Sequence, residues 1–453
     1  MPIGWEERMT KGFGLVAGSL LIPLLLAGCE EQSQTGEMAE QNAEVAAAPQ
    51  YGDEISSLAA RPEIVAAMDN IVAQDAQNLA QVIELTEIPA PPFQEEARAA
   101  RYAEMLREAG LKDVRIDEVG NVIGRRAGTG GGRVVALAAH IDTVFPPGTD
   151  VTVRIEGDTL HAPGVGDNSR GLVVLLSLVR TMEAAGLTTR DDVLFIGTVG
   201  EEGLGDLRGV KHLFRDGGPR IDAFIAVDGG NASRLIHGAI GSHRYRTTFK
   251  GPGGHSWGAF GRVNPHHALG RAIENLDAQA PAVTERGPKS SYSVGRIGGG
   301  TSINSIPFES WMEVDMRSGD QAKLDEIDAV FQQAMLDALK EENDARLDGP
   351  ELTVEVVQVG DRPAGLGDPS HPLVQRTMAA MQAFGIQPRL ASSSTDANIP
   401  ISLGVPAVTI TRGGVGQNVH APNESWRNED SHVAIQLALL LVLAEAGYEG
   451  QAS

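Results

Sequence analysis

Several short motifs in this chain of 453 residues carry side chains that could bind metal ions or transfer protons. They are His140 with Asp142, Asp167, Glu201 with Glu202, Asp228, and His420. Neutral imidazole and carboxylate groups suit zinc, cobalt or manganese ions. Two such ions about 3.5–4 Å apart require a bridging carboxylate, further ligands on each ion and a base beside a bridging water. The residue types therefore match a two-metal hydrolytic site.

Three of these motifs come directly after apolar runs that are typical of buried parallel strands. The runs are residues 134–139 before His140, 192–200 before Glu201, and 223–227 before Asp228. The carboxyl ends of parallel strands lie at one edge of a sheet, where open α/β sheets place their active sites. We therefore expect the motifs to meet at that edge.

The spacing within two motifs predicts how their side chains divide the chemistry. His140 and Asp142 are two residues apart, so they point the same way on an extended chain. We expect the Asp142 carboxylate to hydrogen-bond the far imidazole nitrogen and fix its tautomer. Glu201 and Glu202 diverge at a strand end, so one can bind metal while the other reaches the activated water.

Each motif also has a simpler interpretation. Asp167 lies in Gly-Val-Gly-Asp-Asn and Asp228 precedes two glycines, and both patterns are typical of turns. A Glu-Glu pair usually lies on a solvated helix face, and His420 alone could be a surface histidine. Their order and their position after strands favour the catalytic interpretation.

The combined pattern resembles the co-catalytic two-metal peptidase family of peptidase T, glutamate carboxypeptidase, dipeptidase and acetylornithine deacetylase, and in particular its peptidase T-like members. A second family of aminopeptidases has similar motifs. The long segment between Asp228 and His420 distinguishes them, because it is sufficient for an inserted domain. That segment contains Gly-Gly-His255-Ser, Asn304 and Arg317, which are similar to the lid-domain residues of the first family.

The resemblance implies a metal ligand set. His140 and Asp228 would bind one divalent ion, Glu202 and His420 would bind the other, and Asp167 would bridge the two. The expected ions are two Zn²⁺, with Co²⁺ or Mn²⁺ as alternatives.

The resemblance also implies catalytic and substrate-binding roles. Glu201 would be the general base that deprotonates the bridging water, and Asp142 would orient the first histidine. His255 would stabilise the oxyanion. Asn304 and Arg317 would hold a substrate carboxylate, since arginine offers a planar fork that matches it. A turn and a surface ion pair are the alternatives for these lid residues.

Two stretches depart from the family pattern or match it loosely. Residues 168–170 are Asn-Ser-Arg, where Asp or Met and then Lys are more usual. Residues 392–398 align with a Gly-Thr-Asp or Gly-Ser-Asp segment of peptidase T-like members. Thr395 and Asp396 would then line the substrate site and face a substrate amine, although a plain turn would explain the same residues.

The N-terminal region predicts a lipoprotein. Residues 13–28 are apolar, follow Arg8 and Lys11, and have the length of a signal-peptide core, with either Met1 or Met9 as the start. The segment Leu-Ala-Gly-Cys29 resembles a bacterial lipobox, so Cys29 would be lipidated and would anchor the chain in the cell envelope, facing the periplasm or the exterior. A buried membrane anchor is the alternative. Residues 1–28 would be the signal peptide, and the polar, acidic residues 29–60 a disordered tether.

The remaining chain predicts an α/β fold in two domains. Strands and helices alternate over residues 61–244 and 361–449, as in a zinc-peptidase-like catalytic domain with a mixed, mainly parallel sheet. Residues 245–360 predict the order βαββαβ, which is the ferredoxin-like unit. This insert would be the lid domain, and the resemblance makes it a candidate homodimer interface.

Composition and motifs together lead to a ranked set of functions. The net charge of −23 and the absence of a basic patch argue against nucleic-acid binding. We expect a membrane-tethered metallopeptidase that hydrolyses short peptides as a di- or tripeptidase, aminopeptidase or carboxypeptidase. The alternatives are an N-acyl-amino-acid deacylase that uses the same site and an inactive peptide-binding lipoprotein.

Overall fold

The computed structural model describes residues 45–451. The predicted signal peptide, Cys29 and the first part of the predicted tether lie outside the described residues. Within residues 45–451, no helix combines the length and the apolar character that crossing a membrane requires.

Four helices open the described chain. They are α1 (Pro49–Ala59), α2 (Pro62–Ala73), α3 (Asp75–Thr86) and α4 (Glu96–Glu108). The sequence predicts one continuous helix over residues 61–87, whereas the structure has two that meet at Gln74.

The end of the predicted tether is a helix, so that prediction is wrong for residues 49–59. Helix α1 begins with Pro49, which suits the first helical turn, and buries Ile55 and Leu58 in the main core. It packs against α10 (Pro372–Ala383) and α12 (His432–Ala446). The segment buries only these two large apolar side chains, so its own pattern gives a weak helix signal. The helix is stabilised by contacts with elements far along the chain, and a local sequence pattern does not reveal such contacts.

The catalytic domain is built on a mixed sheet of nine strands, which confirms the predicted fold class. Its strands are β1 (Asp113–Ile116), β2 (Val122–Arg126), β7 (Asp192–Thr198), β3 (Val134–His140), β8 (Ala223–Gly229), β18 (Ala407–Thr411), β9 (Arg234–Ala239) and β16 (Gly365–Leu366) in spatial order, with β17 (Arg389–Ser393) beside β9. The central neighbours β7, β3, β8 and β18 are parallel, and the pairs toward β1 and β16 are antiparallel. The nearly continuous apolar runs reflect burial of both faces of these central strands.

Helices cover both faces of this sheet. The larger core contains side chains of α1 to α4, of α10 and α12, and of α5 (Gly171–Ala184). A smaller core on the other face contains residues of α6 (Arg208–Leu213), α11 (Asn398–Ser402) and their flanking loops. Helices α5 and α12 are apolar on nearly all sides because other elements surround them.

Shorter strands complete the catalytic part. A separate four-stranded sheet has the order β19 (Val415–Gln417), β20 (Ser425–Arg427), β5 (Thr159–His161) and β4 (Arg154–Glu156). Strand β6 (Leu187–Thr189) pairs with β21 (Tyr448–Gln451). The irregular turns η1 (Val165–Arg170) and η2 (Gly203–Gly205) follow β5 and β7.

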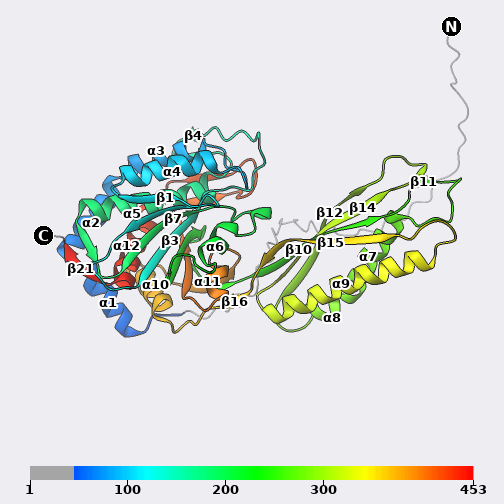
Figure 1. Ribbon diagram of the computed structural model, residues 1–453. Helices are drawn as coiled ribbons and strands as arrows, with labels where there is room; N and C mark the ends of the chain where they lie inside the picture. The colour runs from blue at the N-terminus through cyan, green and yellow to red at the C-terminus, as the bar shows by residue number, and fades with distance from the viewer. Residues whose placement is uncertain (1–44, 452–453) are drawn as a thin grey trace, which may run out of the picture. The chain divides into compact units, whose positions relative to one another are not determined.

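The inserted segment has the predicted βαββαβ order. It consists of β10 (Gly241–Lys250), α7 (Pro265–Gln279), β12 (Ser290–Gly299), β14 (Glu309–Ser318), α9 (Gln321–Asp344) and β15 (Thr353–Arg362), with the short α8 (Pro281–Thr284) after α7. The strands form an antiparallel sheet in the order β12-β14-β10-β15, and α7 and α9 pack on it (Figure 1). A two-residue pairing of β11 (Gly254–His255) with β13 (Ser305–Ile306) lies outside this sheet. We refer to this unit as the lid domain.

Candidate metal centre and active site

The carboxyl ends of three adjacent parallel strands bring the predicted motifs together. His140 is the last residue of β3, Asp228 lies near the end of β8, and Glu201 follows β7. Strand β3 lies between β7 and β8, so residues from all three strand ends face one cavity. The cavity has a volume of about 270 Å³, and all five predicted metal ligands and Glu201 line it.

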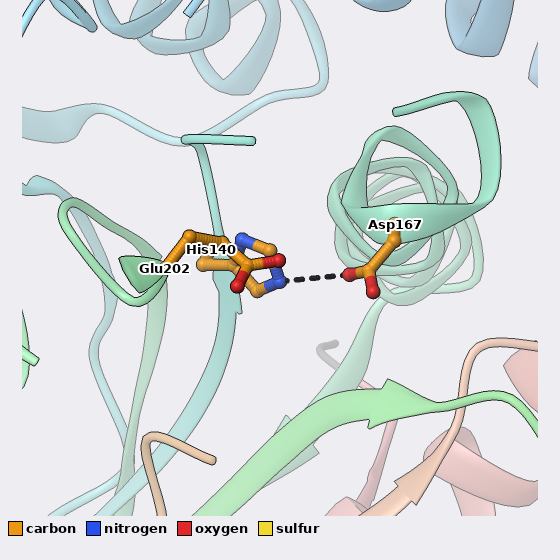
Figure 2. A group of neighbouring side chains, drawn as sticks. All are labelled: His140, Asp167 and Glu202. Atoms are coloured by element: carbon orange, nitrogen blue, oxygen red, sulfur yellow. Dashed lines mark hydrogen bonds and ion pairs between the residues drawn. The ribbon is translucent and has the colours of Figure 1, made fainter. Parts of the chain in front are cut away.

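Asp167 lies between the two histidines. Its Oδ1 is 3.0 Å from Nε2 of His140, and its Oδ2 is 3.4 Å from Nε2 of His420. Asp228 approaches the first imidazole at 3.5 Å, and Glu202 approaches the second at 2.8 Å. Figure 2 shows His140, Asp167 and Glu202 converging from separate elements. The result is two sets of one histidine and one carboxylate, with Asp167 shared between them.

The donor set fits a pair of divalent metal ions. Burial alone would lower the pKa of His140, but its bonds to Asp167 and Asp228 outweigh burial and raise the pKa well above its usual value. Bonds to Asp167 and Glu202 raise the pKa of His420 to about 10. Each imidazole therefore has carboxylates around it that stabilise a positive charge at its Nε2. A divalent ion supplies that charge and accepts the same nitrogen and oxygen donors.

The loop that carries Asp167 is held by Glu424. The buried Glu424 carboxylate accepts hydrogen bonds from the backbone N–H groups of Gly164, Gly166 and Asp167 at 2.7, 3.0 and 3.1 Å. Burial raises the pKa of Glu424 to about 7, although these donors oppose the shift. The peptide bond between Asp167 and Asn168 is cis. Asn168 stands where Asp or Met is more usual in the family that the sequence resembles, and its side-chain amide donates a hydrogen bond to the carbonyl of Val227.

Asp142 makes different contacts with His140 and with the Glu-Glu motif from those that the sequence predicts. Its carboxylate is 3.9 Å from Nδ1 of His140, too far for a hydrogen bond, so the predicted contact is wrong. Nδ1 lies 3.0 Å from the Asp142 backbone carbonyl instead. The carboxylate accepts from the backbone N–H groups of Glu201 and Glu202, at 3.0 and 2.8 Å. The backbone turns after His140, so the carbonyl orients the imidazole and the side chain fixes the Glu-Glu motif.

Glu201 is buried beside Arg362. Burial raises the pKa of Glu201 well above its usual value, and the adjacent positive charge of Arg362 opposes that shift. Nη1 of Arg362 is 3.2 Å from Glu201 Oε1, and its Nη2 donates to the Glu201 backbone carbonyl. Nη1 also donates to Ser394 at 2.9 Å. Arg362 therefore fixes the position of the predicted base without binding it through both carboxylate oxygens.

The predicted substrate-binding residues divide into two groups. Arg317 and Thr395 line the metal cavity, whereas His255, Asn304 and Asp396 are not among its lining residues. Asp396 is buried, and its Oδ2 accepts from Thr198 at 2.5 Å. This places Asp396 close to His140 and Asp142 in the surrounding protein rather than in the cavity wall.

His255 and Asn304 lie together in the lid domain. His255 belongs to β11, and Asn304 directly precedes β13, which pairs with it. The carbonyl of Asn304 accepts from the backbone N–H of Ser256 at 2.9 Å, and both side chains are exposed. Their roles in substrate binding therefore stay predictions, and the structure shows only that the two residues are neighbours in the lid domain.

Comparison with known proteins identifies the family. The profile of peptidase family M20/M25/M40 matches residues 136–444, which is more than half of the chain and contains all of the predicted metal-ligand motifs. The chain belongs to peptidase family M20/M25/M40. The sequence-based resemblance is thereby confirmed, and the protein is an enzyme of a peptidase family.

Proteins similar to this M20/M25/M40 enzyme include hydrolases and peptidases. It is 42% identical over 120 residues to a LysW-lysine/LysW-ornithine hydrolase of Pyrococcus abyssi, an alignment that covers 26% of this chain and 32% of that protein. The chain therefore matches only about a third of the length of that relative. Two solved structures share the fold: aminopeptidase PepT of Bacillus cereus (21% identity, TM-score 0.65, covering 82% and 98% of the two chains) and the dinuclear metal-binding M20 peptidase YXEP of Bacillus subtilis (17%, 0.59, 83% and 99%).

Three residues of this M20/M25/M40 site escaped the sequence analysis: Arg362, Arg412 and Glu424. Arg412 is buried at the end of β18, and its Nη1 is 3.1 Å from both Asp167 Oδ1 and Asp228 Oδ1. The sequence contains one signal for Arg412, which directly follows the apolar strand at residues 407–411. A charged residue at the end of a buried strand requires an oppositely charged or hydrogen-bonding partner nearby. Arg362 lay at the predicted domain boundary, and Glu424 in a loop, so neither had a comparable local signal.

Proposed function

We propose that the protein is a two-metal hydrolase that cleaves the peptide bond of short peptides, as a di- or tripeptidase, aminopeptidase or carboxypeptidase. The observation that carries the proposal is the position of Asp167, whose two carboxylate oxygens face different histidines at 3.0 and 3.4 Å. His140 and Asp228 would hold one ion and His420 and Glu202 the other. We expect Zn²⁺ at both positions, with Co²⁺ or Mn²⁺ as substitutes.

Divalent ions at these positions would polarise the amide carbonyl and lower the pKa of a water molecule. Glu201 takes the proton of the attacking water and delivers it to the leaving amine nitrogen. A raised pKa suits this double role, because the carboxyl must both accept and release a proton near neutral pH. Arg362 holds Glu201 in place during both transfers.

Arg317, which lies in the cavity wall, would bind the substrate carboxylate. Closure of the lid domain would add His255 as a donor to the oxyanion that forms on the substrate carbonyl, and Asn304 as a second contact. Thr395 contributes a hydroxyl to the same cavity. These roles rest on the family resemblance, and the cavity position of Arg317 and Thr395 supports their part of the proposal.

A second candidate function is N-acyl-amino-acid deacylation. The observation that favours it is the same Arg317, because an N-acyl amino acid also carries a carboxylate next to its amide bond. Both reactions use the same attack and the same proton transfers.

A substrate panel distinguishes these reactions. The purified full-length protein, supplied with Zn²⁺, Co²⁺ or Mn²⁺, would be tested on di- and tripeptides, on N-acetyl and N-succinyl amino acids, and with Glu201→Gln as the blank. We expect cleavage of peptides. Cleavage of acyl amino acids alone would establish the deacylase, and binding of peptides without any cleavage would establish an inactive binding protein.

The cellular location and the assembly are part of the proposal. Lipidation of Cys29 would anchor the enzyme in the bacterial cell envelope, facing the periplasm or the exterior. The lid domain would form a homodimer, which its exposed apolar side chains near His255 support, among them Trp257 at 88% exposure and Phe260 at 83%. Membrane fractionation of wild type and Cys29→Ser tests the anchor, and light scattering of the detergent-solubilised protein tests the dimer.

A further inference from the structure

The lid domain is joined to the catalytic domain through two neighbouring strands. The chain enters the lid domain at Gly241, where β10 begins, and leaves it at Arg362, where β15 ends. These strands are antiparallel neighbours, and Ser242 lies opposite Arg362. We refer to residues 241–244 and 360–362 as the hinge end of the lid domain. A change in the orientation of the lid domain has to act at this end.

Both strands of the hinge end contact the segment that carries the proposed base. Nη1 of Arg362 is 3.2 Å from Glu201 Oε1, and its Nη2 donates to the Glu201 backbone carbonyl. Nη1 of Arg244 donates to the backbone carbonyl of Gly203 at 2.7 Å. The start of β10 and the end of β15 are therefore both bonded to the turn that follows β7.

Asp206 forms a third connection, from the catalytic domain to β15. Its Oδ1 accepts a hydrogen bond from the backbone N–H of Asp361 at 2.9 Å. Its Oδ2 lies 2.5 Å from Nζ of Lys211, a residue of α6. The Asp206 carboxylate is thus fixed within the catalytic domain by one oxygen, and with the other it holds the residue directly before Arg362.

The local structure of β15 accommodates these contacts. A Cβ atom on the buried Gly360 would lie 3.0 Å from Cδ of Arg244 and 3.3 Å from Oδ1 of Asp206, closer than ordinary van der Waals contact. The pairing of β10 with β15 also shifts register between Arg244 and Tyr245, next to this position. Such irregularities redirect side chains beside active sites. The absence of a side chain at Gly360 leaves the space that Arg244 and Asp206 occupy.

The position of Arg362 depends on its backbone. Its Nε is buried and has no hydrogen-bond partner within residues 45–451, so only the two Nη atoms at the tip of the side chain are bonded. A shift of the backbone at Asp361 would move that tip away from Glu201. Small displacements of this kind matter, because a misplacement of about 1 Å can slow a reaction by about 10²-fold.

We infer that Asp206 is a positioning residue of this hydrolase. By holding the backbone at Asp361, it keeps Arg362 within reach of Glu201 and couples the orientation of the lid domain to the position of the base. This inference rests on the proposed function and adds to it a residue that lies outside the cavity wall.

Substitutions at Asp206 test the inference by steady-state kinetics on the full-length protein. Asp206 has a φ of 53°, so Asp206→Gly removes the carboxylate without straining the backbone. We expect kcat to fall about two- to tenfold, the weight of one exposed hydrogen bond, with KM and zinc content unchanged. Asp206→Asn keeps an acceptor oxygen and tolerates the same φ, so it should recover most of the loss. Asp216→Gly is the matched control, because Asp216 is exposed in the loop after α6.

The control should have wild-type kcat. An unchanged kcat in Asp206→Gly, or an equal loss in Asp206→Asn and Asp206→Gly, would overturn the inference.

A double-mutant cycle distinguishes positioning from a general structural effect. If Asp206 acts through Arg362, then adding Asp206→Gly to Arg362→Gln should lower kcat no further than Arg362→Gln alone. Residues that act through one another show such non-additive effects, whereas independent effects multiply. Losses of kcat that multiply in the double variant would overturn the inference.

Hydrogen exchange of the zinc-loaded full-length protein provides a measurement that does not depend on turnover. In Asp206→Gly, the amide of Asp361 should exchange faster because it loses its acceptor. The amides of residues 201–202 should also exchange faster if the hinge end and this segment are coupled, and Asp216→Gly should change neither. Faster exchange at Asp361 alone would overturn the coupling. A wild-type protein that cleaves no substrate would contradict the proposed function, and the exchange result would still decide the coupling.

Discussion

At the scale of single residues, the two glutamates of the Glu-Glu motif have different neighbours, as the proposed division between proton transfer and metal binding requires. Glu202 contacts His420, whereas Glu201 is held by Arg362 and lies in the cavity wall. We predict that Glu201→Gln retains metal and fold and lowers kcat by about 10²–10⁴-fold, the usual contribution of a general base. Steady-state kinetics with metal analysis of the same sample provide the measurement. Wild-type turnover in this variant would show that another group is the base.

The hydrogen bonds of Glu424 to the loop that carries Asp167 lead to a prediction about metal affinity. Glutamine has nearly the same size as glutamate, but its NH₂ group cannot accept a hydrogen bond. One or more of the backbone N–H groups that now donate to the Glu424 carboxylate would therefore lose their acceptor. We expect Glu424→Gln to weaken zinc binding by about 10–100-fold, because the loop that carries Asp167 loses its support. Competition with a zinc chelator measures the change. Glu429→Gln, at an exposed position a few residues away, should leave the affinity unchanged.

The sequence was sufficient to predict which motif residues meet in one cavity, but not the residues that hold them in place. His140, Asp167 and His420 could be identified because metal chemistry restricts residue type and because strand ends restrict position. The role of Asp142 was misjudged because the direction of its carboxylate depends on how the backbone turns after β3. Arg362 and Glu424 act through contacts with residues far away in the chain, and local patterns do not encode such contacts.

At the scale of elements, helix α1 is part of the catalytic domain. Ile55 is fully buried, and Ala48, just before the helix, donates its N–H to the Gln375 side chain at 2.7 Å. We predict that Ile55→Ala destabilises the protein by about 2–5 kcal/mol, as a buried isoleucine does when truncated. Thermal and urea unfolding measure the loss. Ser57, which is exposed on the same helix, provides the control. Ser57→Ala should change the free energy of unfolding by less than about 0.5 kcal/mol.

The elements could be predicted from sequence to different degrees. The order of all six main elements of the lid domain was predicted, because the strands alternate and the helices have a clear apolar face. Helix α1 was not predicted, because its stability comes from α10 and α12 rather than from its own pattern. The break at Gln74 has no glycine or proline to mark it.

At the scale of the whole molecule, metal ions should contribute to stability as well as to chemistry. Asp167, Glu202 and Asp228 converge with two histidines on one cavity. We predict that removing metal with a chelator lowers Tm and that adding Zn²⁺ restores it, since a ligand at a hundredfold excess over its Kd stabilises by about 2.7 kcal/mol per site. Scanning fluorimetry measures the shift. A zinc-independent Tm in the wild type would contradict metal binding by the folded state.

The ligand order along the chain also has a consequence for biosynthesis. His140, Asp167, Glu202 and Asp228 all precede the lid domain, whereas His420 follows it. A nascent polypeptide therefore contains every donor for the first ion well before the second imidazole has been translated. A message truncated within the insert would encode a product with a single-ion centre at most. Completion of the proposed two-ion centre therefore waits until translation has passed the lid domain, and a chain that stops before His420 lacks the full donor set.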